Sequence, residues 1–339
     1  MTPGRAVLLA VAIAATPFMA KTAHACAGCR NPSLPMTRLT NVHLAPGQVR
    51  ASAAASVTTL TVVHEAGCAD VSACSEVPVQ PRYLHDQDLW PAELRATGEV
   101  GLTDATGVEV QLPFRLTRTT IRYRAPDGSP YTPLDPDVHH RNETVAGLGD
   151  PWLTVRYGTT LAGTLVTARA GTTIPLGRVQ DDPFVLGARG QRHQHIQLGN
   201  GTFDPVLGLD LSRTVGPLQL SGYGQTQLTL YENGKGLRAG NRVFAGLQGG
   251  TRLFGATSGA LGLDVLHDAA ERWGGRVQQD GNLGRSELLA GASLTHLFGR
   301  SLLSLLVRVP VYRHIVSGDE PPGTLSSPLM LSLVASHTL

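Results

Sequence analysis

The sequence predicts an all-β fold, a single transmembrane antiparallel up-and-down β-barrel of about 12 strands, with short periplasmic turns and long extracellular loops. Three observations predict it. Segments of alternating apolar and polar residues recur along the chain, their connections are alternately short and long, and a secretory signal opens the sequence. Successive strand side chains point to opposite faces, so a period of two gives a sheet with one apolar and one polar side. Such a sheet suits a barrel with lipid outside and water inside.

The clearest alternation lies in Phe203–Tyr231, where two strand-like runs flank a turn at Val215-Gly216-Pro217. The first run places leucines at positions 207, 209 and 211 on one face and small or polar residues on the other. The second run repeats the pattern, with glutamine, serine, tyrosine and threonine on its polar face. The polar face is too hydrophilic for a sandwich core, and the apolar face is too continuous for a surface in water. We therefore interpret this hairpin as one repeat of an outer-membrane barrel.

The composition agrees with strands and turns that face lipid. Charged residues make up 16% of the chain, below the usual value of about 25%, and glycine is abundant, with 39 residues. A net charge of +2 gives no reason to expect a nucleic-acid partner. Aromatic residues, at 5%, are few for a barrel with complete aromatic girdles.

The N-terminus resembles a secretory signal peptide, which we assign to residues 1–25. An arginine supplies its positive charge, Ala6–Ala15 its apolar segment and Ala23-His24-Ala25 its cleavage site. The apolar segment is too short to cross a bilayer as a helix, and no other segment reaches the required length of about 18 apolar residues. We therefore expect an exported protein with a periplasmic N-terminal segment at 26–47 and an outer-membrane barrel at 48–339.

Four cysteines lie in the N-terminal part of the chain, and their even number in an exported protein suggests two disulfides. Cys68 and Cys74 enclose a short loop, so we expect them to pair with each other. Cys26-Ala-Gly-Cys29 forms a C-x-x-C motif with three open uses: a small disulfide, a metal or redox site, or acylation of Cys26. Arg30 follows the motif, so the histidine of a haem-attachment motif is absent.

Twelve strand candidates follow, each identified by alternation between turn-forming residues. They are residues 48–64, 93–103, 107–124, 152–159, 161–175, 203–213, 216–231, 239–253, 257–269, 286–298, 301–314 and 328–339. Within 301–314, Pro310 removes a hydrogen-bond donor from the ladder, so we expect a bulge or a strand end there.

The lengths of the connections are the strongest argument for a barrel. Short turns join alternate pairs of strands at 104–106, 160, 214–215, 254–256 and 299–300. Longer polar segments join the others, at 65–92, 125–151, 176–202, 232–238, 270–285 and 315–327. Outer-membrane barrels have an even strand count, short periplasmic turns and long outer loops. A soluble sandwich also has many short strands, but it has no reason to sort its connections by length.

Several motifs also resemble those of one known family. They are GEVGLTDATGVEVQLPF (98–114), GLGDPWLTVRYG (147–158), TARAGTTIPLG (167–177), GNGTFDPVLGLDLSRTVGPL (199–218) and RVPVYRHI (308–315). Their order over about residues 90–339 is similar to that in the outer-membrane transporter barrels described as phenol meta-degradation-pathway proteins, loose relatives of the fatty-acid and aromatic-hydrocarbon channels. The resemblance implies outer-membrane passage of small hydrophobic or aromatic compounds. The long N-terminal hatch of the fatty-acid channels has no clear counterpart in this sequence.

Ten charged residues fall on the polar faces of the predicted strands. They are Glu109, Arg115, Arg156, Arg169, Asp210, Arg242, Arg252, Asp264, Glu287 and Arg308. An arginine that faces lipid at the bilayer midplane costs roughly 2–4 kcal/mol, so we expect these side chains to face the lumen. Six arginines against four acids favour a slightly basic pore that prefers anions. The alternative is a network of arginine–carboxylate pairs that fills the narrow barrel and holds it rigid.

Histidines form a second candidate site. His139 and His140 are adjacent in one predicted outer loop, and His193 and His195 lie in another. In an extended segment, H-x-H places both rings on one side, and imidazole binds Zn, Cu or Ni. Together with His85 or nearby carboxylates, these residues would form a surface metal site, and the alternative is a set of solvated polar loops.

The sequence thus predicts a passive outer-membrane channel for small molecules, in contact with membrane lipid and without a cofactor. The first alternative is a structural or partner-binding barrel whose C-x-x-C segment docks a periplasmic redox or metal protein. The second is a barrel enzyme, and we expect no catalytic residues for two reasons. No H-x-S pair or G-x-S-x-G elbow occurs, and Ser293 and His296 lie on opposite faces of one predicted strand.

Overall fold

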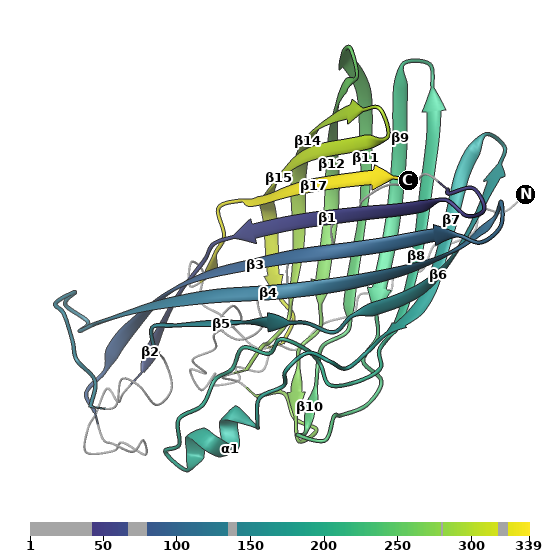
Figure 1. The fold of residues 1–339 in the computed structure, drawn as a ribbon. Coiled ribbons are helices and arrows are strands. Elements are labelled where there is room, and N and C mark those ends of the chain that lie inside the picture. Colours follow the sequence, from purple (N-terminus) through teal and green to yellow (C-terminus); the bar gives the residue numbers. More distant parts are fainter. Residues whose placement is uncertain (1–42, 67–79, 135–140, 279–280, 318–324) are drawn as a thin grey trace, which may run out of the picture.

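A computed structural model of the chain describes residues 43–66, 80–134, 141–278, 281–317 and 325–339, and it shows a closed antiparallel β-barrel (Figure 1). Its strands are β1 (Val49–Thr58), β2 (Leu60–Ala66), β3 (Tyr83–Gly101), β4 (Thr106–Arg124), β5 (Glu143–Leu148), β6 (Trp152–Leu161), β7 (Thr164–Thr173), β8 (Pro205–Val215), β9 (Leu218–Gln227), β11 (Arg242–Phe254), β12 (Thr257–Asp268), β14 (Arg285–Phe298), β15 (Ser301–Ile315), β16 (Leu325–Ser326) and β17 (Met330–Thr338). The predicted signal peptide, the four cysteines and the His139-His140 pair lie outside the described residues.

The barrel closes because β3 pairs with both β1 and β4, while β1 also pairs with β17. In the described part of the chain the ring has twelve strands, in the order β1, β3, β4, β6, β7, β8, β9, β11, β12, β14, β15 and β17. Three of them are extended after a break, as β2, β5 and β16. The predicted all-β barrel of about 12 strands is therefore confirmed. Closure pairs the backbone groups that an open sheet edge would expose to lipid.

Tight turns form one end of the barrel. Four hairpins turn at Ala162-Gly163, Gly216-Pro217, Gly255-Ala256 and Gly299-Arg300, and the glycine of each has positive φ. Glycine adopts this conformation without the steric cost of a side chain. The predicted turn at Thr160 is wrong by two residues, because Thr160 still pairs with β7 and the chain reverses where a glycine is available.

The strands extend farther toward the opposite end than the alternation predicted. β3 begins at Tyr83, inside the predicted loop 65–92, and β5 lies inside the predicted loop 125–151. Beyond the membrane both faces of a sheet can be polar, so the apolar–polar alternation that marks the spanning part is lost there. The irregularity predicted at Pro310 is confirmed, because the register between β14 and β15 shifts opposite this residue.

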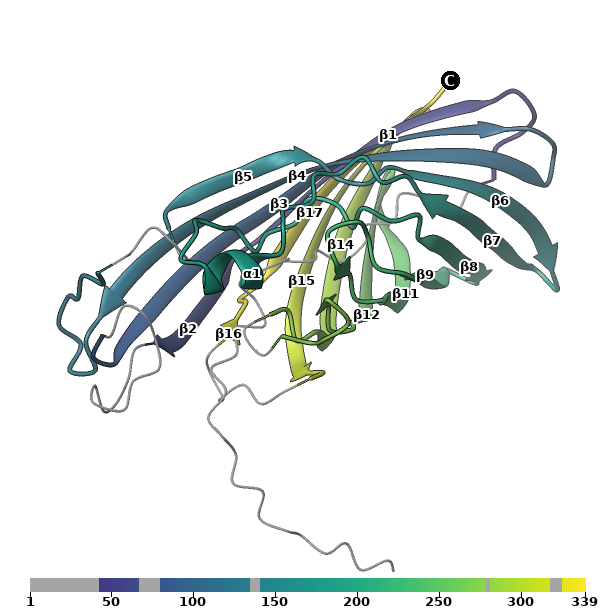
Figure 2. The same cartoon turned by 90° about the horizontal axis from the view of Figure 1, so that it is seen from below.

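The long connections gather at the end opposite the tight turns (Figures 1 and 2). One of them contains the short helix α1 (Pro183–Ala188), and the Asp182 carboxylate caps it by accepting hydrogen bonds from the N–H groups of Phe184 (2.9 Å) and Val185 (3.2 Å). Two others pair as β10 (Leu237–Arg238) and β13 (Arg272–Trp273). Among the described residues, no helix is long and apolar enough to cross a membrane. We call this end the loop side and the other the turn side.

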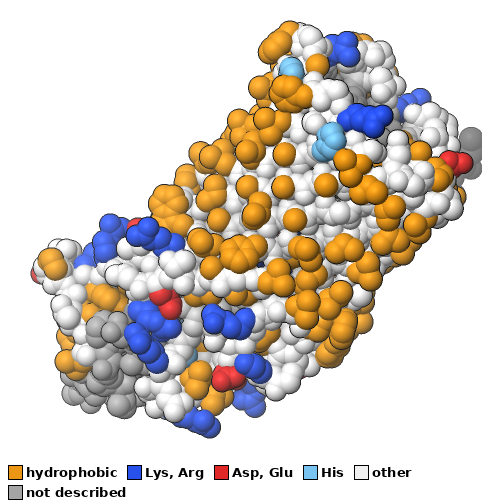
Figure 3. Space-filling model, viewed as in Figure 1, with side chains coloured by type: hydrophobic (Ala, Val, Ile, Leu, Met, Phe, Trp, Pro, Cys, Tyr) orange, Lys and Arg blue, Asp and Glu red, His pale blue; other side chains and the backbone are white. Residues whose placement is uncertain are grey.

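The outer face of the wall is a broad apolar band (Figure 3). Its leucines are well exposed, for example Leu94, Leu209, Leu247, Leu263 and Leu305. The inner faces of the same strands carry arginines and carboxylates that are almost completely buried. This distribution is the inverse of a soluble barrel, which keeps apolar side chains inside.

The few aromatic side chains are concentrated near the two rims of this band. Trp90, Phe203, Tyr231 and Tyr312 are exposed toward the loop side. Tyr157, Phe254 and Phe298 are exposed toward the turn side. Amphipathic rings favour the level of lipid headgroups, so even this small aromatic content marks two interfaces.

Candidate functional site in the barrel lumen

The first group of inward side chains forms the turn-side network. Its members are Arg50, Glu99, Glu109, Arg156, Arg169 and Asp210, contributed by β1, β3, β4, β6, β7 and β8. Arg50 Nη2 lies 2.6 Å from Glu99 Oε2, and Arg169 Nη1 lies 2.7 Å from Asp210 Oδ2. Arg156 forms an ion pair with Glu99 and lies 3.9 Å from Glu109. Three arginines thus meet three carboxylates, which compensates charges that burial would otherwise destabilise.

The second group forms the loop-side network. Its members are Arg242, Asp268, Arg285, Glu287 and Arg313, from β11, β12, β14 and β15. Arg242 Nε lies 2.8 Å from Asp268 Oδ1, and Arg313 Nε donates to Glu287 Oε1 at 2.6 Å. Arg285 lies between the two carboxylates, at 4.0 Å and 3.8 Å. This group carries one arginine more than it has acids, so its formal charge is positive.

A third group in the lumen is the ion pair of Arg308 with Asp264. Arg308 Nε donates to Asp264 Oδ2 at 2.6 Å, and the Tyr223 hydroxyl donates to the other oxygen of the same carboxylate. Gly246, directly across from Asp264, has no side chain that would occupy this space. An added Cβ would lie 2.7 Å from the Tyr223 hydroxyl, so the close approach requires glycine.

Nine of the ten predicted lumen residues have an ion-pair partner, contributed in most cases by another strand. Arg252 is different, because it is exposed at the turn-side end of β11 beside a register shift. No ion pair of Arg252 occurs within the part of the chain that is described. Several charged residues of the lumen are not among the ten predicted ones. For some of them the strand alternation in the sequence would have indicated an inward position. Glu93, Arg95 and Glu99 share one face of a predicted strand, whereas Arg285 and Arg313 stand near strand ends.

An apolar patch interrupts the polar lumen, and we call it the apolar wall. It consists of Trp152, Val206, Phe244, Leu266 and Leu289, all at most 2% exposed. Two arginines cover its aromatic rings: Arg95 lies 5.2 Å from the Trp152 ring centre and Arg308 lies 5.2 Å from that of Phe244. Such cation–π contacts hold a guanidinium against an apolar surface. These residues occupy inward positions where the strand pattern predicted polar side chains.

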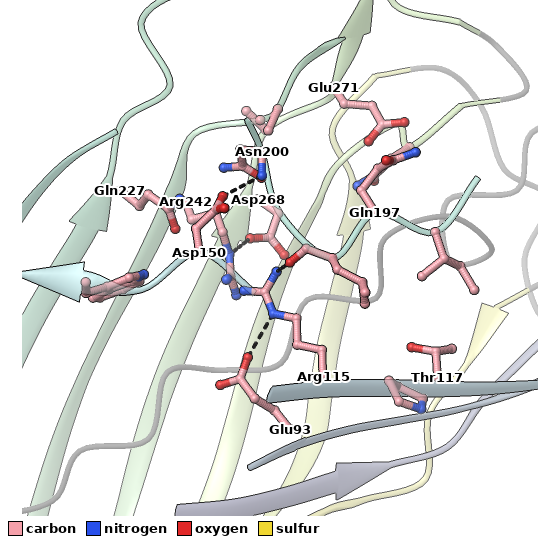
Figure 4. Close-up of a pocket in the computed structure, with 18 of the residues that line it drawn as sticks. Glu93, Arg115, Thr117, Asp150, Gln197, Asn200, Gln227, Arg242, Asp268 and Glu271 are labelled. Carbon is pink, nitrogen blue, oxygen red and sulfur yellow. Dashed lines mark hydrogen bonds and ion pairs between the residues drawn. The ribbon is translucent and has the colours of Figure 1, made fainter. Parts of the chain in front are cut away.

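A cavity lies on the loop side of the apolar wall (Figure 4). Arg115 crosses it, donating from Nε to Glu93 Oε2 at 3.1 Å and from Nη1 to the carbonyl oxygen of Leu198 at 2.8 Å. Trp152 and Arg242 also line it. Its volume is about 50 Å³, which holds a few water molecules, whereas sites for drug-sized ligands measure about 300–1,000 Å³. In this conformation this cavity is therefore closed to a drug-sized ligand.

The closure comes from residues 176–202, which we call the plug loop. The carboxylate of Asp150 holds both of its ends, accepting hydrogen bonds from the N–H groups of Gly177 (2.8 Å) and Asn200 (2.6 Å). Gly177 and Gly199 touch there, and a Cβ on Gly177 would lie 2.6 Å from the Gly199 Cα. The two ends of the loop can therefore approach only as glycines.

A second buried carboxylate fixes the chain just after the plug loop. Asp204 accepts hydrogen bonds from Asn200 Nδ2 (2.7 Å), Thr202 Oγ1 (2.7 Å) and Gln227 Nε2 (2.8 Å). All three donors are neutral, and Asp204 is fully buried. Asp204 is not among the predicted site residues, although the polar spacing Asn200-x-Thr202-x-Asp204 in the sequence is a signal for it.

The plug loop covers a gap in the barrel wall. β5 and β6 both pair with β4, and the residues between them, Gly149-Asp150-Pro151, are not in a strand. β5 is the last strand of the sheet order, so its second edge lacks a strand partner within the described residues. Beside it, Ile196 and Leu198 of the plug loop pack with Val145 of β5 and with leucines of β2 and β3. Apolar packing of the loop thus replaces strand pairing at this gap.

Both histidines of the plug loop, His193 and His195, have buried side chains. The His193 and His195 rings lie 5.0 Å apart, and His195 packs edge-on against Phe184 of α1. His85 lies elsewhere, in a cluster with Tyr83 and Tyr123. The described residues contain no group of three metal-ligating side chains. The metal site stays a prediction, since His139 and His140 lie outside the described residues.

At the turn side, the segment before β1 folds against the inner wall. Leu44 is 3% exposed, and a Cβ on Gly158 would lie 2.8 Å from His43 Nδ1. Gly158 shares the inward face of β6 with Trp152 and Arg156. The end of the segment predicted to be periplasmic therefore narrows this mouth of the lumen.

Hydrogen-bonded closure, an apolar exterior and a polar lumen define the class of the protein as a transmembrane β-barrel. Its fold is similar to that of an outer membrane channel from Pseudomonas putida F1, with a TM-score of 0.53 and 14% identity, over 87% of this chain and 97% of that chain. The P. putida toluene transporter TodX gives a TM-score of 0.41 at 9% identity, over 86% of this chain and 89% of that one. The Ralstonia pickettii toluene transporter TbuX gives 0.38 at 11%, over 87% and 90%. No protein-family model and no curated protein matches the chain.

Proposed function

We propose that the protein is an outer-membrane channel through which small, mainly apolar or aromatic molecules diffuse. The observation that carries the proposal is the apolar wall, because a barrel that conducted only ions would have no use for five buried apolar side chains in its lumen. The similar fold of an outer membrane channel and the resemblance of the sequence motifs support the location and the class.

The route runs from the loop side, through the cavity of Figure 4, along the apolar wall and past the turn-side network. The ion pairs hold the narrow wall rigid and leave little free charge for ion selectivity. Opening requires movement of the plug loop, since the cavity beneath it holds only a few water molecules. The nine predicted lumen residues that form ion pairs would then act mainly as structural supports of the path.

Flux through reconstituted vesicles tests the proposal. A small aromatic acid such as benzoate crosses lipid slowly in its ionised form, so its influx into vesicles with the barrel should exceed influx into empty vesicles. Val206→Thr replaces a methyl group of the apolar wall with a hydroxyl of similar size. We expect this variant to pass benzoate several-fold more slowly, with unchanged chloride conductance in a planar bilayer. A folded barrel whose vesicles admit benzoate no faster than empty ones would contradict the proposal.

The two alternatives gain no specific support. The C-x-x-C segment that would dock a periplasmic partner lies outside the described residues. His296, the histidine considered for an enzyme, forms a hydrogen bond through Nδ1 with Thr257 Oγ1 at 2.7 Å, and its ring packs at a tilt against Phe298 near the turn-side rim. We therefore propose transport without catalysis.

A further inference from the structure

The outward side chains of β3, β4 and β5 change from apolar to charged toward the loop side. Cross-strand pairing arranges them in rows. Counted toward the loops, the rows are Leu94–Phe114–Leu148, Ala92–Leu116–Ala146 and Trp90–Arg118–Thr144. The first row is exposed and fully apolar, and the third combines an aromatic ring, a cation and a hydroxyl. We call the third row the boundary row, because the hydrocarbon level ends there.

Beyond the boundary row the same outer face is charged. Arg122 Nη2 lies 3.0 Å from Asp88 Oδ2, and Arg124 Nε lies 2.9 Å from Asp86 Oδ2. These exposed pairs place this part of β3 and β4 in an aqueous layer, because lipid tails would not solvate them. Both aspartates are thus occupied, and within the described residues no carboxylate pairs with Arg118. The boundary row therefore carries an exposed positive charge.

On the outward strand faces at the loop side, the positive charge is unevenly distributed around the barrel. Figure 3 shows Lys and Arg side chains gathered beside the apolar band at the loop end. By contrast, the loop-side ends of β11, β12, β14 and β15 present Val243, His267, Ser286 and His314 in adjacent outward positions. This row contains no arginine or lysine. A general preference for anionic membrane would not require such asymmetry, whereas a site for one bound lipid would.

We propose that the boundary row binds a phosphate group of lipid A, the anchor of lipopolysaccharide in the outer leaflet. Arg118 supplies the charge, Thr144 a hydroxyl donor beside it, and Trp90 a ring at headgroup level. The row beneath has two alanines, Ala92 and Ala146, and these short side chains leave room for acyl chains against the wall. This inference rests on the outer-membrane location that the proposed function assumes.

The site adjoins the gap that the plug loop covers. Thr144 belongs to β5, whose second edge has no strand partner among the residues that the structure describes. A lipid held at the boundary row therefore flanks this edge on the membrane side, while the plug loop flanks it on the inner side. The bound lipid shields the backbone groups of β5 from competing strands.

Lipid retention by the purified barrel tests the site. The folded protein in neutral detergent is mixed with bisphosphorylated lipid A, and bound lipid is counted by native mass spectrometry. We expect retention of lipid A but not of the same lipid stripped of its phosphates. Arg118→Gln should weaken binding about fivefold, the usual contribution of one cation at an anionic surface. Arg189→Gln, a change of an exposed arginine in the plug loop, is the matched control and should bind as the wild type does.

Three outcomes would overturn the site: equal retention of phosphate-free lipid A, unchanged binding by Arg118→Gln, or equal retention of phosphatidylglycerol. Far-ultraviolet circular dichroism confirms that each variant is folded before binding is measured. The assay is independent of transport, because benzoate flux is measured in phosphatidylcholine vesicles that contain no lipid A. Loss of lipid A binding with intact flux removes this inference alone, and loss of flux with intact binding removes only the channel proposal.

Discussion

Removal of the Asp150 carboxylate should release the plug loop. In Asp150→Ala, the N–H groups of Gly177 and Asn200 lose their shared acceptor, while the strands keep their pairing. A hydrogen bond to a charged group stabilises a fold by about 1.5–3 kcal/mol, and here two are lost. Water recovers part of this when the loop opens, so we take about 3 kcal/mol as the change in closure free energy. Since about 1.4 kcal/mol is a factor of ten, the open population should rise about a hundredfold.

Hydrogen exchange and conductance measure this release together. Amides of residues 176–202 should exchange about a hundredfold faster in Asp150→Ala, while amides of β8 and β9 keep their protection. Planar-bilayer recordings should show more frequent or larger openings than in the wild type. Asp181→Ala is the control, because Asp181 lies in the same loop, is largely exposed and pairs with Lys235 at the surface. Unchanged exchange and conductance in Asp150→Ala would refute the idea that this carboxylate holds the loop closed.

Three further predictions concern stability. Asp210→Asn removes the charge 2.7 Å from Arg169 and should cost about 3 kcal/mol in urea unfolding followed by tryptophan fluorescence; an unchanged midpoint would contradict a tight network. Gly246→Ala places a Cβ against lumen side chains and should cost about 1–3 kcal/mol, whereas Gly224→Ala enters open space and should be neutral. Burial lowers the pKa of His85 to about 4, with partial opposition from a neighbouring aspartate. His85 therefore binds a proton at a higher pH in the unfolded state than in the folded state. The loop-side end of β3, which contains His85, should lose at most about 3 kcal/mol of stability as pH falls from about 6.5 to 4. Hydrogen exchange of 83–90 should show this loss, and His85→Gln should abolish it.

The spanning strands could be predicted because lipid constrains every second residue. In β8 and β9 an outward polar residue or an inward run of leucines would destabilise the barrel. The alternation therefore predicts where the strand lies and which of its side chains face lipid. Beyond the boundary row that constraint ends. Tyr83–Leu89 alternates between buried and partly exposed residues, but its outward face contains aspartates, and this part of β3 was therefore assigned to a loop.

The partners within the lumen could not be predicted from the strand pattern. Arg156 was expected to face inward, but its carboxylates come from β3 and β4, and their height relative to β6 depends on strand stagger. The plug loop was harder still, because Asp150 binds amides 27 and 50 residues later in the chain. The apolar wall departs from the alternation of apolar outward and polar inward residues. That departure is the observation on which the proposed function rests.

Closure of the ring by β1 and β17 has a consequence for assembly. Ser56 and Ser332, hydrogen-bonded across this seam at 2.8 Å, are 276 residues apart in sequence. Because β1 and β17 lie near opposite ends of the sequence, the ring can be completed only after nearly the whole chain has reached the membrane. Without the nine residues of β17, the product would not be a slightly smaller barrel. It would leave the backbone N–H and C=O groups along one edge of β1 and one edge of β15 unpaired in lipid. We expect such a product to be degraded and not to form a functional pore.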